Sequence, residues 1–503
     1  MNRISWQRNL GLAGLAALLS LVAGCSLTPA YDRPGAAAPA RFKEDQAAPQ
    51  ESGSWKKAEP SEQIARGAWW TVFSDEKLNR LESEALSNNQ DLKAAAARLA
   101  QANAARGNAR ASLFPAIDVG FGATRQKVSP DSLYLPAGAD SPEQTLWRAQ
   151  AGISYETDLF GRVSATISAA TADVQQSEAL FRSVLLALQA SVAQNYFNLR
   201  QLDSEIDVLK HAAGLREQTL KLVQRRFDEG YINELDVVRA RSELALARSD
   251  EMSVLRQRAA AEHGLAALLG KVPAEFSVAE NLLSPVTVQI PAGLPSSLLE
   301  RRPDIAAAER AMAAANARIG VARAAFFPSL SLTGNAGFES ASFDHLFRWS
   351  SRTFLLGPLV GTALSLPIFD GGARDSVLAG SRAKYEEDVA NYRQHVLTAF
   401  QEVEDNLANL RILREQVTIQ DSAIEASSRA AQLSRRQYNE GSISFLDVLD
   451  AERSELTTQR TRIRLQGALA ASTVNLVRAL GGGWGNANAS TPRANAPTLL
   501  NPS

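Results

Sequence analysis

Cysteine and histidine are scarce in this sequence. The 503 residues contain one cysteine, Cys25, and four histidines. A single cysteine excludes an internal disulfide and leaves no thiol for a metal site or a nucleophile in the rest of the chain. The histidines are His211, His263, His345 and His395, and each lacks a partner ligand at metal-binding spacing. We therefore expect no enzyme, no metal and no bound cofactor.

An excess of one charge and a long apolar run are also missing. Lys and Arg number 53 against 54 Asp and Glu, so the net charge is −1 and nucleic acid is not an expected partner. Beyond the N-terminus no apolar stretch reaches the roughly 20 residues that a membrane-spanning helix needs. Hydrophobic residues still make up 45% of the chain, which excludes wholesale disorder. The chain folds, and it does so without an expected transmembrane helix.

The first 25 residues resemble a bacterial lipoprotein signal peptide. Arg3 and Arg8 precede a short apolar segment, which ends in Val22-Ala23-Gly24-Cys25. The resemblance implies removal of residues 1–24, diacylglycerol on the Cys25 thiol and acylation of its new amine. Ser26 follows, instead of the Asp that would suggest retention in the inner membrane. An uncleaved membrane anchor with an incidental cysteine is the alternative.

Proline is absent from two long windows, residues 143–272 and 368–491. Proline inside a helix costs about 3 kcal/mol, and apolar residues recur in both windows at spacings of three and four. The pattern predicts two very long helical regions, each reversing at one glycine, Gly230 or Gly441. Residues 162–229 alone would form about 100 Å of helix, which is more than a globular core can use.

The segments outside these windows differ in composition. Residues 28–60 are rich in Ala, Pro, Gly and charge, so we expect an extended tether or wrap over residues 25–66. Residues 482–503 offer little to bury, and they predict a disordered tail.

The chain contains an internal duplication. Residues 227–237 match 438–448 at an offset of 211, and residues 103–115 match 316–328 at an offset of 213. The simplest account is two repeats, 67–285 and 286–481, with the same order of elements.

Each repeat carries two segments that alternate apolar and polar residues. They cover residues 117–124 and 147–156 in the first repeat, and 330–339 and 356–366 in the second. Tilted membrane strands have about this length. Four strands cannot close a barrel, and an open edge in lipid leaves backbone groups unsatisfied, so three chains with twelve strands are indicated. Ordinary hairpins of a soluble domain are the alternative.

These features resemble the outer-membrane efflux protein family typified by TolC and OprM, in its lipoprotein branch, often called NodT-like. The motifs that carry the resemblance are Ala68-Trp69-Trp70 with Phe73, Asp75 and Leu78; Asn89 to Leu92; Tyr155 to Arg162; Leu298 to Ile305; Phe326-Phe327-Pro328; Leu366 to Gly372; and Gly441 to Ala451. The resemblance implies a mainly α fold with a transmembrane β-barrel. Three chains would share twelve strands, joined to a long periplasmic α-helical barrel.

The resemblance also implies partners and a function. A homotrimer in the outer membrane, anchored by the lipid on Cys25, would passively export drugs or other small molecules. A periplasmic adaptor and an inner-membrane transporter of the resistance-nodulation-division type would complete a tripartite pump. A duct for protein secretion and a structural periplasmic coiled-coil lipoprotein are the alternatives.

Four residues beyond the second tip are candidates for the periplasmic gate. The family resemblance places Asp447 and Asp450 at the narrow end, where three copies would form acidic rings that prefer cations. We expect the side chains of Leu446 and Leu449 to pack at the gate and to stabilise its closed state. The alternative is that the two acids only favour the start of a helix, where negative charge suits the helix dipole.

The resemblance implies a latch and docking tips as well. Asp236 and Tyr438 match a latch of the family by their spacing from Gly230 and Gly441, but Ile443 occupies the position of the latch arginine. Ordinary coiled-coil packing is the alternative for Tyr438. The tip glycines, Gly230 and Gly441, would mark where the adaptor docks.

Overall fold

The computed structural model describes residues 27–35, 39, 41–44, 67–127, 129, 143–286, 301–357 and 363–482. The predicted signal peptide, Cys25 and the predicted tail beyond residue 482 lie outside these ranges. Two compact units are present. Within the described ranges, one contains residues 27–35, 99–177 and 307–392, and the other contains the described residues among 36–98, 178–306 and 393–482.

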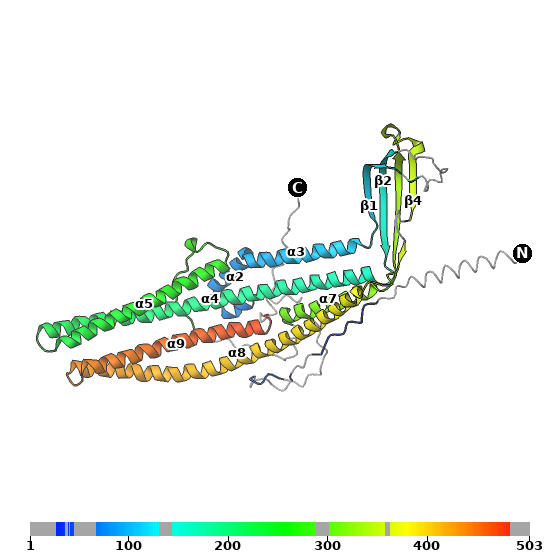
Figure 1. Cartoon of the computed structure of the whole chain (residues 1–503). Coiled ribbons are helices and arrows are strands. Elements are labelled where there is room, and N and C mark those ends of the chain that lie inside the picture. The colour runs from blue at the N-terminus through cyan, green and yellow to red at the C-terminus, as the bar shows by residue number, and fades with distance from the viewer. Residues whose placement is uncertain are drawn as a thin grey trace. The chain divides into compact units, whose positions relative to one another are not determined.

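The helices occur twice in the same order (Figure 1). The first set is α3 (Gln90–Ala111), α4 (Arg162–Asp228) and α5 (Glu234–Leu268), and the second is α7 (Pro303–Ala324), α8 (Ala373–Asn439) and α9 (Phe445–Ala479). Their lengths agree in pairs, with 22, 67 and 35 residues. The two long helical regions predicted within the proline-free windows are therefore present, as α4 with α5 and α8 with α9. None of the helices in the described ranges combines the length and apolar character needed to cross a bilayer.

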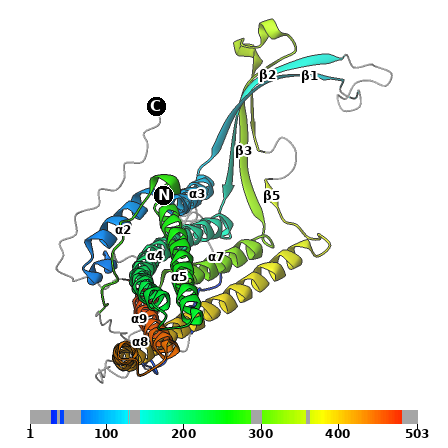
Figure 2. The ribbon, with the colours of Figure 1, turned by 90° about the vertical axis from the view of Figure 1, so that its left-hand side faces the viewer.

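The strands form one antiparallel sheet in the first unit, with β2 between β1 and β3 (Figure 2). They are β1 (Ala116–Gln126), β2 (Gln144–Thr157), β3 (Ser329–Ser340), β4 (Arg352–Leu356) and β5 (Leu364–Ser365). β4 and β5 pair with opposite ends of β3. The prediction that the fourth strand starts at Leu356 is wrong, because the chain already pairs with Phe338 at Arg352.

The register brings apolar residues of all four main strands onto one face. Val119, Ala151, Ala336 and Phe354 lie opposite one another in a single row, and Val119 and Phe354 are 82% and 78% exposed. The other face is polar and includes an ion pair of 2.7 Å between Arg148 and Glu339. This two-faced sheet confirms the predicted alternation.

The second unit has a core built on a short N-terminal segment and the middle of α4. The 3-10 helix η1 (Trp69–Phe73) leads into α2 (Glu76–Asn88), whose N-terminus is capped by Asp75. The other carboxylate oxygen of Asp75 accepts a hydrogen bond of 2.5 Å from the Tyr196 hydroxyl. Trp69 is 1% exposed and donates its indole N–H to Gln189 at 3.0 Å. These contacts fix η1 and α2 against α4.

The described residues of the predicted tether lie against the long helices, so the segment is a wrap there. Phe42 is 1% exposed. The backbone N–H groups of Lys43 and Glu44 donate to the Glu404 carboxylate at 2.7 and 3.0 Å, and Glu44 pairs with Arg411 at 2.8 Å. These contacts attach the segment to α8 in the second unit.

One acidic residue of α2 is buried without a partner. Glu82 is fully buried, and neither carboxylate oxygen has a hydrogen-bond partner among the described residues. Burial raises the pKa of Glu82 to about 9, because an uncompensated charge is poorly solvated inside a protein. Glu82 is therefore protonated at neutral pH.

We expect Glu82→Gln to stabilise the protein between pH 5 and 9. The folded state binds the Glu82 proton more tightly than the unfolded state, so the native protein loses stability as pH rises from the ordinary glutamate pKa of 4.5 to about 9. The loss is at most about 1.4 kcal/mol per pH unit. Gln removes it. Hydrogen exchange of α2 against pH measures the effect, with Glu76→Gln on the exposed side as control. Identical pH slopes for both variants would contradict this account.

Candidate functional site

Both helix reversals of the second unit use the same turn. α4 and α5 lie side by side up to their shared turn, and so do α8 and α9 (Figure 1). Gly230 and Gly441 have φ angles of +83° and +80°, which favour glycine. Tyr231 N–H donates to the Arg226 carbonyl, and Ser442 N–H to the Gln437 carbonyl, both at 2.8 Å. This is the Schellman end of a helix. The predicted reversal at each glycine is confirmed, and adaptor docking stays a prediction.

The two reversals share one apolar core, which we call the tip core. Its buried members are Val223, Val237, Ala240, Tyr438, Phe445, Val448 and Leu449, and Ile443 packs against them. The inward face of α9 therefore follows residues 445, 448 and 449. Leu449 is only 3% exposed, whereas Leu446 is 41% exposed. Leu449 thus packs in the core of its own chain, and the role of Leu446 and Leu449 in the closed gate stays a prediction.

The two candidate gate acids have different environments. The Asp447 carboxylate accepts hydrogen bonds from the backbone N–H and the hydroxyl of Ser444, at 3.1 and 2.7 Å, and forms a capping box. This supports the helix-start alternative for Asp447. The Asp450 side chain is 64% exposed, and its nearest cation is Arg453 at 3.4 Å. Asp450 is thus the acid whose charge is open to solvent, and its place at the gate stays a prediction.

A buried acid holds Arg453 from the other side. Glu243 of α5 is 3% exposed and accepts a hydrogen bond from Arg453. Glu243 also lies 3.6 Å from Arg216 of α4. Three helices thus meet at one carboxylate. Sequence reasoning missed this link, because Glu243 and Arg453 are 210 positions apart and neither belongs to a motif.

The predicted latch residues do not meet within the chain. The Tyr438 ring lies in the tip core, with the Arg226 guanidinium 4.9 Å from its centre and Phe445 at 5.5 Å. Its hydroxyl has no hydrogen-bond partner in the part of the chain that the structure describes. Asp236 instead pairs with Arg239 at 3.5 Å. Within one chain Tyr438 lies in apolar packing, and the latch of Asp236 with Tyr438 stays a prediction.

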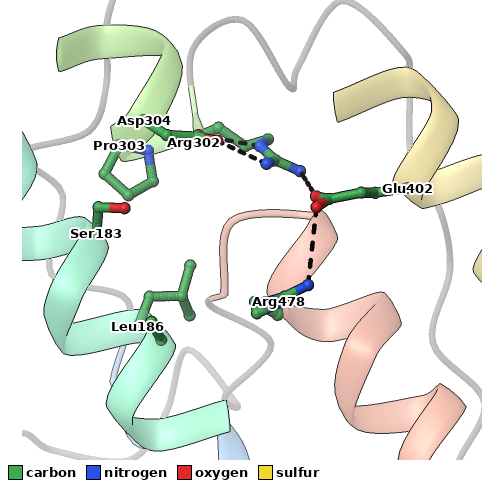
Figure 3. Close-up of a pocket in the computed structure, with 8 residues that line it drawn as sticks. Ser183, Leu186, Arg302, Pro303, Asp304, Glu402 and Arg478 are labelled. Atoms are coloured by element: carbon green, nitrogen blue, oxygen red, sulfur yellow. Dashed lines mark hydrogen bonds and ion pairs between the residues drawn. The ribbon is translucent and has the colours of Figure 1, made fainter. Parts of the chain in front are cut away.

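A second charged cluster of this unit surrounds Arg302 (Figure 3). The guanidinium donates twice to Asp304, at 3.0 and 2.6 Å, and once to Glu402 at 2.6 Å. It also donates to the carbonyl of Ala479 at 3.1 Å, in the last turn of α9. Arg478 lies 3.7 Å from the other oxygen of Glu402. One buried side chain therefore joins α7, α8 and α9.

The charges of this Arg302 cluster balance. Two guanidinium groups face two carboxylates around a cavity of about 160 Å³. Burial opposes ionisation of Asp304, but the bonds from Arg302 outweigh it and hold the pKa of Asp304 below its ordinary value. The cluster is a structural clamp, since no charge is left over for a ligand. The sequence shows Arg302 and Asp304 in a motif but not the distant partners of Arg302, which are Glu402 and the Ala479 carbonyl.

The described ranges contain no group of three or more His, Cys, Asp or Glu side chains placed to hold a metal ion.

Residues 81–271 and 294–482 both match the model of the outer membrane efflux protein family. The chain belongs to that family. It is 36% identical over 476 residues to the probable efflux pump outer membrane protein TtgC of Pseudomonas putida, covering 94% of this chain and 96% of that protein. Cation efflux system protein CusC of Escherichia coli is 33% identical over 465 residues, with 92% and 96% covered.

Solved channels share the fold of this efflux protein. The outer-membrane channel OprN superposes with a TM-score of 0.81 at 30% identity, over 92% of this chain and all of that one. The Campylobacter jejuni CmeC outer membrane channel gives 0.82 at 27% identity, over 91% and 95%. The predicted fold, family and outer-membrane location are confirmed. The protein is the outer-membrane channel component of an efflux pump, and its relatives are channel or transport proteins.

We expect Arg302→Met to destabilise the channel by about 3–5 kcal/mol, because Asp304 and Glu402 would stay buried without their cation. The matched control is Arg318→Met, which removes an ion pair with Asp173 whose side chains are 51% and 36% exposed. The control should cost at most about 1 kcal/mol. Thermal unfolding in detergent measures both.

Neutralising the two carboxylates that Arg302→Met leaves unpaired should restore part of the lost stability. The triple variant Arg302→Met/Asp304→Asn/Glu402→Gln is therefore expected to unfold at a higher temperature than Arg302→Met. Equal costs for Arg302→Met and Arg318→Met would rule out the clamp.

Proposed function

We propose that three copies of this chain form the exit duct of a tripartite efflux pump and export small molecules passively. The two-faced sheet carries the proposal. The outer edges of β1 and β4 pair with no other strand in the described part of the chain. Lipid cannot satisfy free backbone groups, so neighbouring chains must pair with these edges. Four strands from each of three chains give an even-numbered, closed barrel of twelve.

Aromatic side chains at both ends of the strands support a membrane position. Phe121, Trp147 and Phe343 cluster at one end, with ring centres 5.1–6.4 Å apart. Phe160, just after β2, stacks on Phe327, just before β3, at 5.0 Å. Aromatic girdles of this kind flank the apolar band of membrane barrels.

The exposed tip surface supports docking of a periplasmic adaptor. Tyr231 is 76% exposed, Leu235 52% and Leu446 41%, all within a few residues of Gly230 or Gly441. Exposed apolar groups next to a rigid turn are typical of binding surfaces. An inner-membrane transporter of the resistance-nodulation-division type would supply the energy, since the duct itself is passive.

The relatives suggest the cargo. Similar proteins of Pseudomonas putida are named for efflux of toluene, antibiotics and solvents, and that of Escherichia coli for efflux of cations. We infer that this duct passes small molecules of varied chemistry. The compound is then selected by the transporter, because a wide passage need not bind its cargo.

The N-terminal lipid is part of the proposal. The signal-peptide pattern around Cys25 supports processing at this residue, with diacylglycerol on its thiol and an acyl group on its amine. The lipid adds a second attachment to the outer membrane beside the strands.

Deleting the gene should raise susceptibility to antibiotics, dyes and detergents, and a plasmid copy should reverse this. Two glycine variants sharpen the test, since Gly120 and Gly337 pair with Gln150 from opposite sides. A Cβ at Gly337 would lie 2.2 Å from the Ala149 carbonyl oxygen, whereas one at Gly120 meets nothing within 4 Å. Gly120→Val should therefore complement the deletion and Gly337→Val should not. Full complementation by Gly337→Val would contradict a role for the sheet in transport.

The gate prediction separates the two acids. We expect Asp450→Asn to lose most of the cation selectivity in planar bilayers, because its charge is exposed. Asp447→Ala should mainly loosen the start of α9, at a cost of about 1 kcal/mol for the lost cap. The double variant Asp447→Ala/Asp450→Ala should also lose block by multivalent cations, with trimers intact. Unchanged selectivity in the double variant would make both acids helix-start residues only.

A further inference from the structure

Residues 28–31 lie along α7 in the first unit and make three contacts with it. Thr28 rests on Gly320. The Pro29 carbonyl accepts a hydrogen bond of 2.8 Å from the Asn316 side chain. The Tyr31 hydroxyl donates to the carboxylate of Glu309 at 2.9 Å. Residue numbers rise in the segment as they fall in α7, so the segment runs antiparallel to the helix.

The contact at Gly320 is this close because glycine has no side chain. A Cβ at this position would lie 2.2 Å from the Thr28 hydroxyl oxygen and 2.9 Å from its Cα. Both distances are far below ordinary van der Waals contact. The missing side chain of Gly320 therefore makes the groove into which Thr28 fits.

Two aromatic hydroxyls hold the other end of the segment. Glu309, which accepts from Tyr31, is 3% exposed, and burial together with this carboxylate raises the pKa of Tyr31. Arg33 donates its Nε–H to the Tyr392 hydroxyl at 3.0 Å, and its guanidinium lies 5.6 Å from the centre of that ring. Residues 28–33, which we call the strap, thus join α7 to α8.

The first repeat has two of the residues that contact the strap in the second repeat, but no segment of the described chain covers them. Asn103 and Gly107 of α3 correspond to Asn316 and Gly320. A Cβ at Gly107 meets nothing within 4 Å, and the Asn103 side chain bonds to its own helix, at the Leu99 carbonyl.

The polar anchors of the strap exist only in the second repeat. Where the second repeat has Glu309 and Tyr392, the first has Ala96 and Phe181. The strap therefore has one binding site in the chain, although its glycine groove is duplicated.

The strap is separated from Cys25 by a very short segment. Only Ser26 and Leu27 separate Cys25 from Thr28, and three peptide units span at most about 10 Å. Gly320 lies about one helical turn before α7 ends at Ala324, and β3 begins at Ser329. The number of peptide units thus limits how far along the chain a group on Cys25 can lie from Thr28, which contacts α7 near the end that leads into β3.

We propose that the strap is a positioning site for the lipid anchor. It holds Cys25 so that its acyl chains enter the inner leaflet beside the foot of β3 of the same chain. In this arrangement the lipid has a fixed position next to the barrel and is not attached to a freely moving segment. This inference rests on lipidation of Cys25, which forms part of the proposed function.

Disulfide trapping tests the docking itself. In a Cys25→Ser background, Thr28→Cys/Gly320→Cys should form an intramolecular disulfide on mild oxidation of membranes, whereas Thr28→Cys/Gly107→Cys should not. The Cβ positions at 28 and 320 lie 2.9 Å apart, somewhat closer than the usual 3.5–4.5 Å, so the strap has to shift by about an ångström. Equal trapping at both positions, or none at either, would overturn the strap.

A photoreactive fatty acid tests the placement of the lipid. Cells fed a diazirine-bearing palmitate should incorporate it at Cys25, and light should then cross-link it to peptides from the end of α7 and the foot of β3. Gly320→Leu should keep the label but lose these cross-links at least fivefold. Gly107→Leu should match the natural protein, and Cys25→Ser should carry no label.

Two outcomes of the cross-linking would overturn the proposal. One is an unchanged cross-link pattern in Gly320→Leu, and the other is the absence of label in the natural protein. Complementation of the gene deletion is scored separately in each variant. Normal drug resistance with failed cross-linking would reject the strap and leave the duct intact, whereas failed complementation by the natural gene would reject the duct.

Discussion

Every backbone group of a strand in lipid must find a hydrogen-bond partner, and this chain meets that demand only in part. β2 and β3 are paired on both sides, while β1 and β4 each keep one outer edge unpaired in the described residues. A water-filled lumen could satisfy the polar face, where Arg148 and Glu339 pair, but not the edges. The strands can therefore insert into the membrane only when several chains assemble. The repeated layout suits this assembly, since each repeat contributes two strands to the shared sheet.

Duplication supplied the architecture, and substitution then made the two repeats different. The lengths of α4 and α8 are the same, and both hairpins turn on a glycine with the same hydrogen bonds. The charges diverge at the tips: Asp236 and Asp447 correspond, but Asp450 corresponds to Arg239. In the first repeat Asp236 is paired with that arginine, whereas the second repeat carries a further acid, Asp450, at the same position.

Sequence alone predicts the elements well because their signals are local. Proline exclusion located the long helices, glycine marked both reversals, and alternation marked the strands. The errors and omissions concern contacts between distant segments. The burial of Leu449 in the tip core was not foreseen, because periodicity cannot tell which side of α9 meets the other hairpin. The distant partners of Arg302, Glu402 and the Ala479 carbonyl, lie 100 and 177 positions away, and no local pattern points to them. Glu82 reads as an ordinary surface acid of a helix until the structure shows it buried.

How the tip is held follows from these differences. A latch arginine at position 443 would have to leave the tip core to reach an acid, but Ile443 packs into it. The charged link in this chain is instead Glu243 to Arg453 to Asp450, and it begins at a carboxylate that is only 3% exposed. Salt screens exposed pairs far more than buried ones, so the inner bond should persist when the outer one weakens. The buried carboxylate of Glu243 then fixes the position of Arg453. Asp450 is held by its exposed contact with Arg453, which salt screens. High salt should accordingly free the charge of Asp450 without opening the tip, because apolar packing and a buried acid keep the two hairpins together.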